Sequence, residues 1–416
     1  MQKIQGYICM DGKIIYLIVS TEDDIHLVKG GIGTYLGLLV QAFMRHRPDI
    51  NVIWVTEAPN DCFFVEHRSN CRVFYLPKNN LQRKILRLCQ RICKFADRNK
   101  LFIEAPDWEG LLADLYVRNL GQNVTKITRL HSVLALTKQN CTDFSAQEKA
   151  QIEQERKQLL HTDVISAPTQ YVYDFTCELF EGKLKDIPYF IIPNFINNTF
   201  ESKNLLLRDE ACSVLNREIG KNIIYSFYKN IFVIGSMEYR KGTDIVISVA
   251  KKLIDYDRHI HIYFLGHYEI DGNSLTLNDK YSLDELNNMI SSAYSDNIHV
   301  CGYVAHDKLS RIYSACDTFL FAYRHDNFPG ALIEACLSGK NIVYMPRGGC
   351  KEMMQIENKV LGLPFDGNNE EELTHNGFVA VMKSLQNIDG YTAEEIKNKY
   401  IEQDILQKMC CDYGIE

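Results

Sequence analysis

Two acidic residues in one short segment have the type and spacing needed to hold a polar ligand. Asp326 lies in a loop after a predicted strand, and Glu334 lies eight residues further on, within the first turns of a predicted apolar helix. Pro329 and Gly330 mark the turn from loop to helix. The backbone N–H groups at a helix start have no intrahelical partner, and together with the helix dipole they favour a phosphate. The two acids could then bind hydroxyl groups of the same ligand, although most such pairs cap a helix and face solvent.

Two adjacent cations, Arg240 and Lys241, stand near the end of a second strand-loop-helix segment that runs from Gly235 to Gly242. Cationic side chains beside a helix start suit the charge of a diphosphate. Taken alone, the pair is more simply explained as the solvated start of a helix.

Glycine residues in the first half of the chain also precede a predicted helix. Gly31 and Gly33 belong to the sequence Gly-Gly-Ile-Gly, whose backbone could approach a phosphate. The loop follows its strand too late, and lacks the third glycine, for a dinucleotide-binding fingerprint. Glu57 nevertheless lies near the end of the next strand, where a ribose-binding acid would be expected.

Further polar residues follow other predicted strands of the first half. His131 ends one strand, and Asp107, Trp108 and Glu109 follow another. Trp108 offers a flat face on which a sugar could stack. Each residue also has an ordinary structural explanation, as a histidine bonded within the fold, as a loop cap or as a buried tryptophan.

Short β-branched runs alternate with longer helical patterns, which predicts parallel sheets covered by helices on both faces. We expect strands at residues 14–19, 52–56, 73–76, 101–104, 125–130, 164–167 and 190–192, and a second series at 231–235, 260–265, 298–301, 318–322 and 341–344. A connection with a helix is expected at 193–229, and helical spacing marks 392–413. A length of 416 residues fits two domains.

The net charge of -7 argues against a protein that coats nucleic acid, so we expect no nucleic-acid partner. The N-terminal apolar run is short and interrupted by charge, unlike a signal peptide, so a cytoplasmic location is expected. The 14 cysteines form no Cys-x-x-Cys pair and are expected to be reduced and mostly buried.

In their order along the chain, these segments resemble the retaining GT-B glycosyltransferases of family 4. The acidic pair resembles the acidic-x7-acidic motif of the family, with Asp326 where the family usually has Glu. The cation segment resembles its loop with a Lys-Gly ending, with Ser236 where the family has Arg. Further matches lie at 265–266, 300–304 and 348–352.

The resemblance implies an α/β fold of GT-B architecture, in which two Rossmann-like, doubly wound domains face a central cleft and a C-terminal helix crosses back to the N-terminal domain. We expect an acceptor-binding domain at residues 1–200, a nucleotide-sugar-binding domain at 201–390 and the returning helix at 391–416. The implied activity is metal-independent hexosyl or glycosyl transfer without a cofactor. The nucleoside diphosphate sugar is the co-substrate, and the acceptor is a saccharide or a polyprenyl-diphosphate-linked saccharide of surface polysaccharide biosynthesis.

The resemblance also implies roles for individual residues. The residues expected at the reacting sugar and the departing diphosphate are Asp326, Lys241, Arg240 and His131. Further donor-binding residues are Glu334, Gly330, Ala331, Leu332, Gly31, Gly33 and Tyr303. Asp107, Trp108 and Glu109 are expected on the acceptor side.

A strongly basic segment, residues 78–100, has eight cationic side chains and the single acid Asp97. Several of the cations recur at helical spacing, with apolar residues on the opposite side. A solvated helix face would normally mix both signs of charge. We therefore expect peripheral contact with an anionic bilayer at the inner face of the membrane. The basic residues expected to make it are Arg83, Lys84, Arg87, Arg91, Lys94 and Arg98.

Two other functions stay open at this point. Doubly wound domains also serve NAD-dependent dehydrogenases and enzymes that modify nucleotide sugars. The departures at Ser236 and Asp326 would also suit a degenerate glycosyltransferase that acts as a non-catalytic partner protein.

Overall fold

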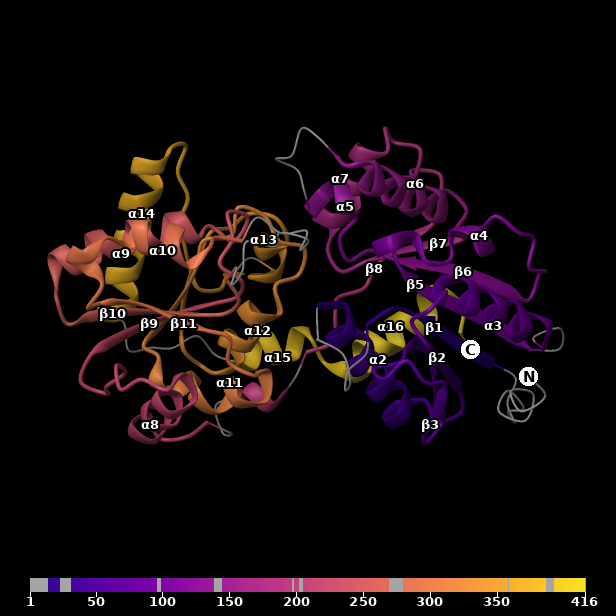
Figure 1. Ribbon diagram of the computed structural model, residues 1–416, viewed down its shortest axis with the longest axis horizontal. Helices are drawn as coiled ribbons and strands as arrows, with labels where there is room; N and C mark the ends of the chain where they lie inside the picture. The colour runs from indigo at the N-terminus through magenta and orange to yellow at the C-terminus, as the bar shows by residue number, and fades with distance from the viewer. Residues whose placement is uncertain are drawn as a thin grey trace. The chain divides into compact units, whose positions relative to one another are not determined.

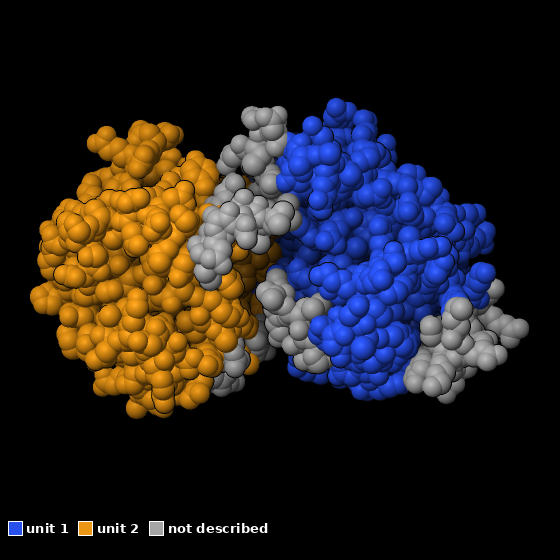
Figure 2. Space-filling model, viewed as in Figure 1, with its two compact units in different colours: residues 1–195, 400–416 blue, residues 196–399 orange. Residues whose placement is uncertain are grey.

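The computed structural model describes residues 14–22, 31–95, 99–137, 144–196, 198–201, 205–268, 280–357, 359–386 and 393–415. The chain divides into two compact units (Figure 2). Unit 1 comprises Met1–Phe195 and Tyr400–Glu416, and unit 2 comprises Ile196–Lys399. Each unit contains a mainly parallel sheet flanked by helices (Figure 1).

The sheet of unit 1 has the order β3-β4-β2-β1-β5-β6-β7-β8. Its strands are β1 (Ile14–Val19), β2 (Asn51–Glu57), β3 (Phe64–Arg68), β4 (Cys71–Leu76), β5 (Lys100–Pro106), β6 (Val124–Arg129), β7 (Val164–Ala167) and β8 (Tyr189–Ile191). The seven expected strands are present and parallel, and β3 is an eighth strand that was not predicted. This edge strand pairs antiparallel with β4 and is partly exposed along its length, so it lacks the apolar run that marks the others.

Helices cover both faces of this sheet. Tyr16 of β1 packs against Phe43 of α2 (Gly31–His46), with ring centroids 4.8 Å apart. The neighbouring residue Leu17 points to the opposite layer, which contains α3 (Leu81–Phe95) and α4 (Ala113–Tyr116). The remaining helical segments of this part are η2 (Trp108–Gly110), α5 (Leu134–Thr137), α6 (Ala146–Leu160) and α7 (Gln170–Leu179).

The sheet of unit 2 has the order β11-β10-β9-β12-β13-β16, all parallel. Its strands are β9 (Lys229–Ile234), β10 (Ile260–Leu265), β11 (Ile298–Gly302), β12 (Thr318–Phe321), β13 (Asn341–Tyr344) and β16 (Leu363–Pro364). One face packs on α9 (Thr243–Tyr256), α10 (Leu283–Ile290) and α14 (Glu370–Gln386). The aromatic side chains of the other face pack toward η6 (Tyr313–Ala315), which contacts α8 (Arg208–Ile219) and α11 (His306–Ile312).

The C-terminal segment forms two helices. α15 (Ala393–Lys399) belongs to unit 2, whereas α16 (Glu402–Tyr413) belongs to unit 1 and packs on α2. The break follows from Ile401, which has the extended backbone of a helix N-cap. The expected return of the C-terminal helix to the first domain is thus present. Within the described ranges, no helix is long and apolar enough to cross a bilayer.

Candidate active site

The loops after β9 and β12 meet at the carboxyl edge of the unit 2 sheet, because these two strands are neighbours. Their contact depends on Gly242, which has a φ of 70° and begins α9. A Cβ atom at this position would lie 1.9 Å from the carbonyl oxygen of Ala322. The Arg240-Lys241 pair is therefore held against the loop that contains Asp326. Ligands of open α/β sheets bind at this edge.

Asp326 is buried and forms ion pairs with both expected cations. Its Oδ2 accepts a hydrogen bond from Arg240 at 3.1 Å and another from Lys241. Burial alone would raise the pKa of Asp326, but the two cations outweigh burial and lower the pKa to about 2. The carboxyl group is therefore ionised at any physiological pH.

A second carboxylate balances the charge of this cluster. The guanidinium of Arg240 also donates to Glu238 Oε1 at 3.2 Å, and Glu238 is almost fully buried. The Lys241 ammonium lies 4.2 Å from the ring centroid of Tyr323. Two cations thus face two carboxylates, Asp326 and Glu238. Any anionic ligand that binds these cations must compete with a carboxylate for them.

The start of α12 (Gly330–Leu337) is open to a ligand. Its N-cap residue, Pro329, provides no side-chain hydrogen bond to the first turn, and Gly330 is exposed with open space where a Cβ would be. Ala331 is half-buried and Leu332 is buried. The Leu332 N–H donates to the Pro329 carbonyl oxygen at 3.0 Å, so the N–H groups of Gly330 and Ala331 are the ones suited to an anion.

Glu334 lies on the same helix and has partners that the sequence analysis did not identify. Its Oε1 lies 2.6 Å from Nε2 of His306, and its Oε2 accepts a hydrogen bond of 3.4 Å from the Tyr313 hydroxyl. A carboxylate has about four acceptor positions, so further hydroxyl groups can still bind. His306 and Tyr313 orient this carboxylate.

Tyr303 follows β11 and is 61% exposed. Its ring stacks on His267, with centroids 4.3 Å apart and planes 16° apart. Partial burial lowers the pKa of His267 from 6.5, so the imidazole is neutral at pH 7. The two rings present a flat aromatic surface after neighbouring strands β10 and β11.

At the carboxyl edge of the unit 1 sheet, Asp107 organises the loop that contains His131. Asp107 is fully buried, and its Oδ1 accepts hydrogen bonds from the backbone N–H groups of Trp108, His131 and Ser132 at 2.9, 2.9 and 3.3 Å. Burial raises the pKa of Asp107 to about 6, although these hydrogen bonds oppose the shift. Asp107 Oδ1 therefore positions His131 from inside the protein, whereas Oδ2 is buried without a hydrogen-bond partner in the described part of the chain, so an acceptor contact of Asp107 stays a prediction.

His131 itself is neutral. Its ring packs edge-on against Tyr35 of α2, with centroids 5.1 Å apart. Burial and the nearby Arg129 guanidinium hold its pKa well below 6.5.

Glu155 of α6 also positions these loops and was missed by the sequence analysis. It is fully buried, with Oε1 accepting from the Glu109 N–H at 3.1 Å and Oε2 from the Leu134 N–H at 2.8 Å. Burial raises the pKa of Glu155 to about 7. Glu109 has a left-handed backbone with a φ of 65°, which this hydrogen bond helps to hold. Trp108 is half-buried beside it.

The two expected donor-binding glycines of unit 1 lie in the first turn of α2. Gly31 is exposed, whereas Gly33 is buried and donates its N–H to Glu22 Oε2 at 2.7 Å. A carboxylate of the protein therefore occupies part of this helix start.

The basic segment forms α3, whose buried side contributes Ile85, Leu88 and Ile92 to the core. On the opposite side, Arg83, Arg87, Arg91 and Lys94 are exposed, whereas Lys84 is half-buried. Arg98 lies outside the described residues. A row of exposed cations therefore runs along α3.

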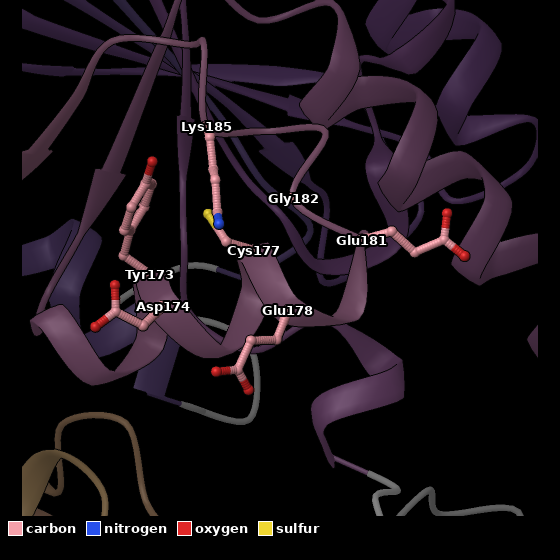
Figure 3. Close-up of a pocket in the computed structure, with 7 residues that line it drawn as sticks. All are labelled: Tyr173, Asp174, Cys177, Glu178, Glu181, Gly182 and Lys185. Carbon is pink, nitrogen blue, oxygen red and sulfur yellow. The ribbon is translucent and has the colours of Figure 1, made fainter.

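A separate hollow of about 400 Å³ lies along α7 and the turn after it, where Tyr173, Cys177 and Lys185 line it (Figure 3). The Tyr173 ring stacks on Tyr189, at the amino end of β8. Three acidic residues in its lining, Asp174, Glu178 and Glu181, would repel an anionic ligand. This hollow is therefore a poor candidate for a phosphate-bearing substrate.

The part of the chain that contains Arg240, Lys241 and Asp326 matches a known protein family. Residues 228–376 match the sequence model of the family described as Glycosyl transferases group 1. Mannosylfructose-phosphate synthase from Agrobacterium fabrum (strain C58 / ATCC 33970) is 24% identical over 295 residues, which cover 66% of this chain and 60% of that protein. The match thus spans less than two thirds of the relative.

Solved structures show a similar fold over almost the whole chain. Sucrose-phosphate synthase from Thermosynechococcus elongatus superimposes with a TM-score of 0.70 at 17% identity, covering 96% of this chain and 98% of that one. HepE from Anabaena, in complex with UDP and glucose, superimposes with a TM-score of 0.64 at 14% identity, covering 96% and 99%. The predicted fold class, an α/β GT-B architecture, is confirmed.

Proposed function

We propose that this chain, whose residues 228–376 match the model described as Glycosyl transferases group 1, transfers a sugar from a nucleoside diphosphate sugar to a saccharide acceptor. One observation carries the proposal. Arg240 and Lys241 converge on a single buried carboxylate, Asp326, in the segment that leads to the open start of α12. This arrangement provides positive charge and a helix start for a diphosphate, and it provides an acid for the sugar.

In the proposed reaction, unit 2 binds the donor. Lys241 and Arg240, with the first turn of α12, stabilise the charge that grows on the departing diphosphate. Arg240 takes the place of the family arginine at Ser236, a role supported by its bond to the same carboxylate as Lys241. Asp326 contacts the donor sugar.

The nucleoside is bound by the remaining expected groups of unit 2. Glu334, oriented by His306, accepts hydrogen bonds from the ribose hydroxyls. Tyr303, stacked on His267, offers an aromatic surface next to the base.

Unit 1 binds the acceptor in this proposal, a saccharide or a polyprenyl-diphosphate-linked saccharide of surface polysaccharide biosynthesis. Trp108 and Glu109 contact the acceptor, and neutral His131 contacts the transferred sugar. The acceptor oxygen attacks the anomeric carbon on the face from which the diphosphate leaves, and the acceptor proton passes to a phosphate oxygen. Configuration is thereby retained without a protein nucleophile or a metal ion.

We also propose that α3 makes a peripheral contact with anionic lipid at the inner face of the membrane. Its exposed cations form one row, and each basic residue near an anionic surface is worth about 1 kcal/mol. A lipid-linked acceptor would be presented at the same surface.

Vesicle flotation tests this contact. The change of Arg87, Arg91 and Lys94 to Glu should abolish binding to vesicles that contain phosphatidylserine. The matched control reverses three exposed lysines elsewhere in unit 1, Lys149, Lys183 and Lys408. Equal flotation of wild type with neutral and anionic vesicles, or loss of binding in the control as well, would contradict the proposal.

Thermal-shift measurement with UDP-, GDP- and ADP-glucose tests donor binding. A ligand at 100 times its Kd adds about 2.7 kcal/mol of stability. Stabilisation by NAD and by none of these nucleotide sugars would favour the dehydrogenase alternative instead.

A further inference from the structure

Lys399, the last residue of unit 2, directs its ammonium group at three backbone carbonyls. Nζ donates hydrogen bonds to the carbonyl oxygens of Glu352, Met353 and Gln355 at 2.6, 3.2 and 2.8 Å. An ammonium group has three N–H donors, so this set uses all of them. Partial burial lowers the pKa of Lys399, and Glu352 opposes the shift.

Two of these carbonyls, of Glu352 and Met353, end α13 (Gly349–Met353), and the third, of Gln355, follows two residues later. Carbonyls in the last turn of a helix have no partner within the helix and form the negative end of its dipole. A lysine ammonium at this end satisfies them and complements the dipole. Lys399 is thus a C-terminal cap that comes from another helix, 46 residues away from Met353.

The other end of α13 touches the loop that contains Asp326. The Gly349 N–H donates to the Asp326 carbonyl oxygen at 2.7 Å. A Cβ atom at Gly349 would lie 2.0 Å from the carbonyl oxygen of Asn327, so the two backbones are in direct contact. A helix of five residues, about 7 Å long, therefore connects Lys399 with the backbone of Asp326.

α15 holds Lys399 in place. Ile396 is buried, and α15 packs on α12, the helix of Glu334. Lys397 forms an ion pair with Glu201 at 3.1 Å. α15 therefore braces the two elements that position Asp326 and Glu334.

We propose that Lys399 is a positioning residue for the donor site, because it fixes α13 and, through it, the backbone of Asp326. This inference rests on the proposed function. Supporting groups of this kind hold binding residues in a productive geometry. The loss of Lys399 should weaken donor binding and leave acceptor binding unchanged.

The test compares variants of the full chain with the nucleotide sugar that stabilises the wild type. Lys399→Met keeps most of the aliphatic stem and removes all three donors, and we expect its donor Kd to rise at least tenfold, with an unchanged acceptor KM. Lys399→Arg should restore most of the affinity, and Lys399→Gln should be intermediate. Lys383→Met, which changes an exposed lysine of α14 in the same unit, is the matched control and should bind donor like the wild type.

The outcomes separate this inference from the proposed function. Wild-type donor affinity in folded Lys399→Met would overturn the inference, even if its Tm fell, because Lys399 would then serve stability alone. If Lys399→Met fails to fold, the Gln variant decides by the same criterion. A wild-type protein that binds none of UDP-, GDP- or ADP-glucose would overturn the proposed function, and this inference with it.

Discussion

Asp326→Asn should make the protein bind a free nucleoside diphosphate more tightly while it transfers sugar more slowly. In the wild type, the Asp326 carboxylate occupies the same two cations that the diphosphate would use. A departing diphosphate therefore competes with a carboxylate that is always available. Asparagine keeps the shape of the side chain and removes its charge.

The magnitude follows from the charges in the cluster. The pKa of Asp326 is lowered from 3.8 to about 2. Its ionised form therefore contributes about 2 kcal/mol to the free energy of unfolding above pH 3.8, and this contribution is lost as the pH falls toward 2. The Asp326 carboxylate and one negative charge of a diphosphate about 5 Å away, at an effective dielectric constant of about 20, repel each other by about 3 kcal/mol. Partial compensation by Arg240 and Lys241 reduces this value, so we expect nucleoside diphosphate binding to tighten about 10- to 100-fold.

Titration calorimetry at pH 7 with UDP, GDP and ADP measures the effect. The matched control is Asp366→Asn, which removes an exposed carboxylate paired with Arg347 in the same unit. Its affinity should equal that of the wild type. Unchanged or weaker diphosphate binding by Asp326→Asn would refute the idea that this carboxylate competes for the cations.

Two further predictions concern other groups. Lys241→Ala and Glu334→Ala should each lose most of the transfer activity. For Lys241→Ala the rate should fall about 10²- to 10³-fold, because one contact to the developing charge is removed. Initial rates with the bound donor test this, and near-normal turnover in both variants would exclude the site. The pKa of Glu155 is raised from 4.5 to about 7, so its contribution to stability is present below pH 4.5 and lost as the pH rises through 7. The advantage of wild type over Glu155→Gln in unfolding free energy should thus shrink by up to about 3 kcal/mol across this range in urea titrations, and a pH-independent difference would contradict the raised pKa.

The sequence predicted most of the fold because buried parallel strands carry continuous β-branched runs, as in β1 and β10. It did not predict β3, whose half-exposed residues show no such run. It also did not predict that the C-terminal segment divides at Ile401, because helical spacing continues across this residue and the break depends on its backbone conformation.

The residues of the candidate site that belong to a sequence motif could be predicted. The contacts between residues that are distant in the sequence could not. The types and order of Asp326 and Lys241 indicated a donor site, yet their direct bond joins residues 85 positions apart. Glu155 gave no signal, since α6 is polar on most of its surface and the partners of this acid are backbone groups of two other loops. The burial of Asp107 could not be predicted either, because the sequence around an acidic loop residue does not show whether its side chain faces a ligand or the protein interior.

The central claim is tested most directly by turnover of a nucleotide sugar. Purified protein is incubated with the UDP-, GDP- or ADP-sugar that stabilises it and with a panel of mono- and disaccharide acceptors, and release of the nucleoside diphosphate is followed by proton NMR. We predict release by the wild type, with Lys241→Ala slower by at least 100-fold, the lower end of what one such contact contributes. Stable donor in the presence of wild type, or equal release by both proteins, would contradict the claim that this cluster performs glycosyl transfer.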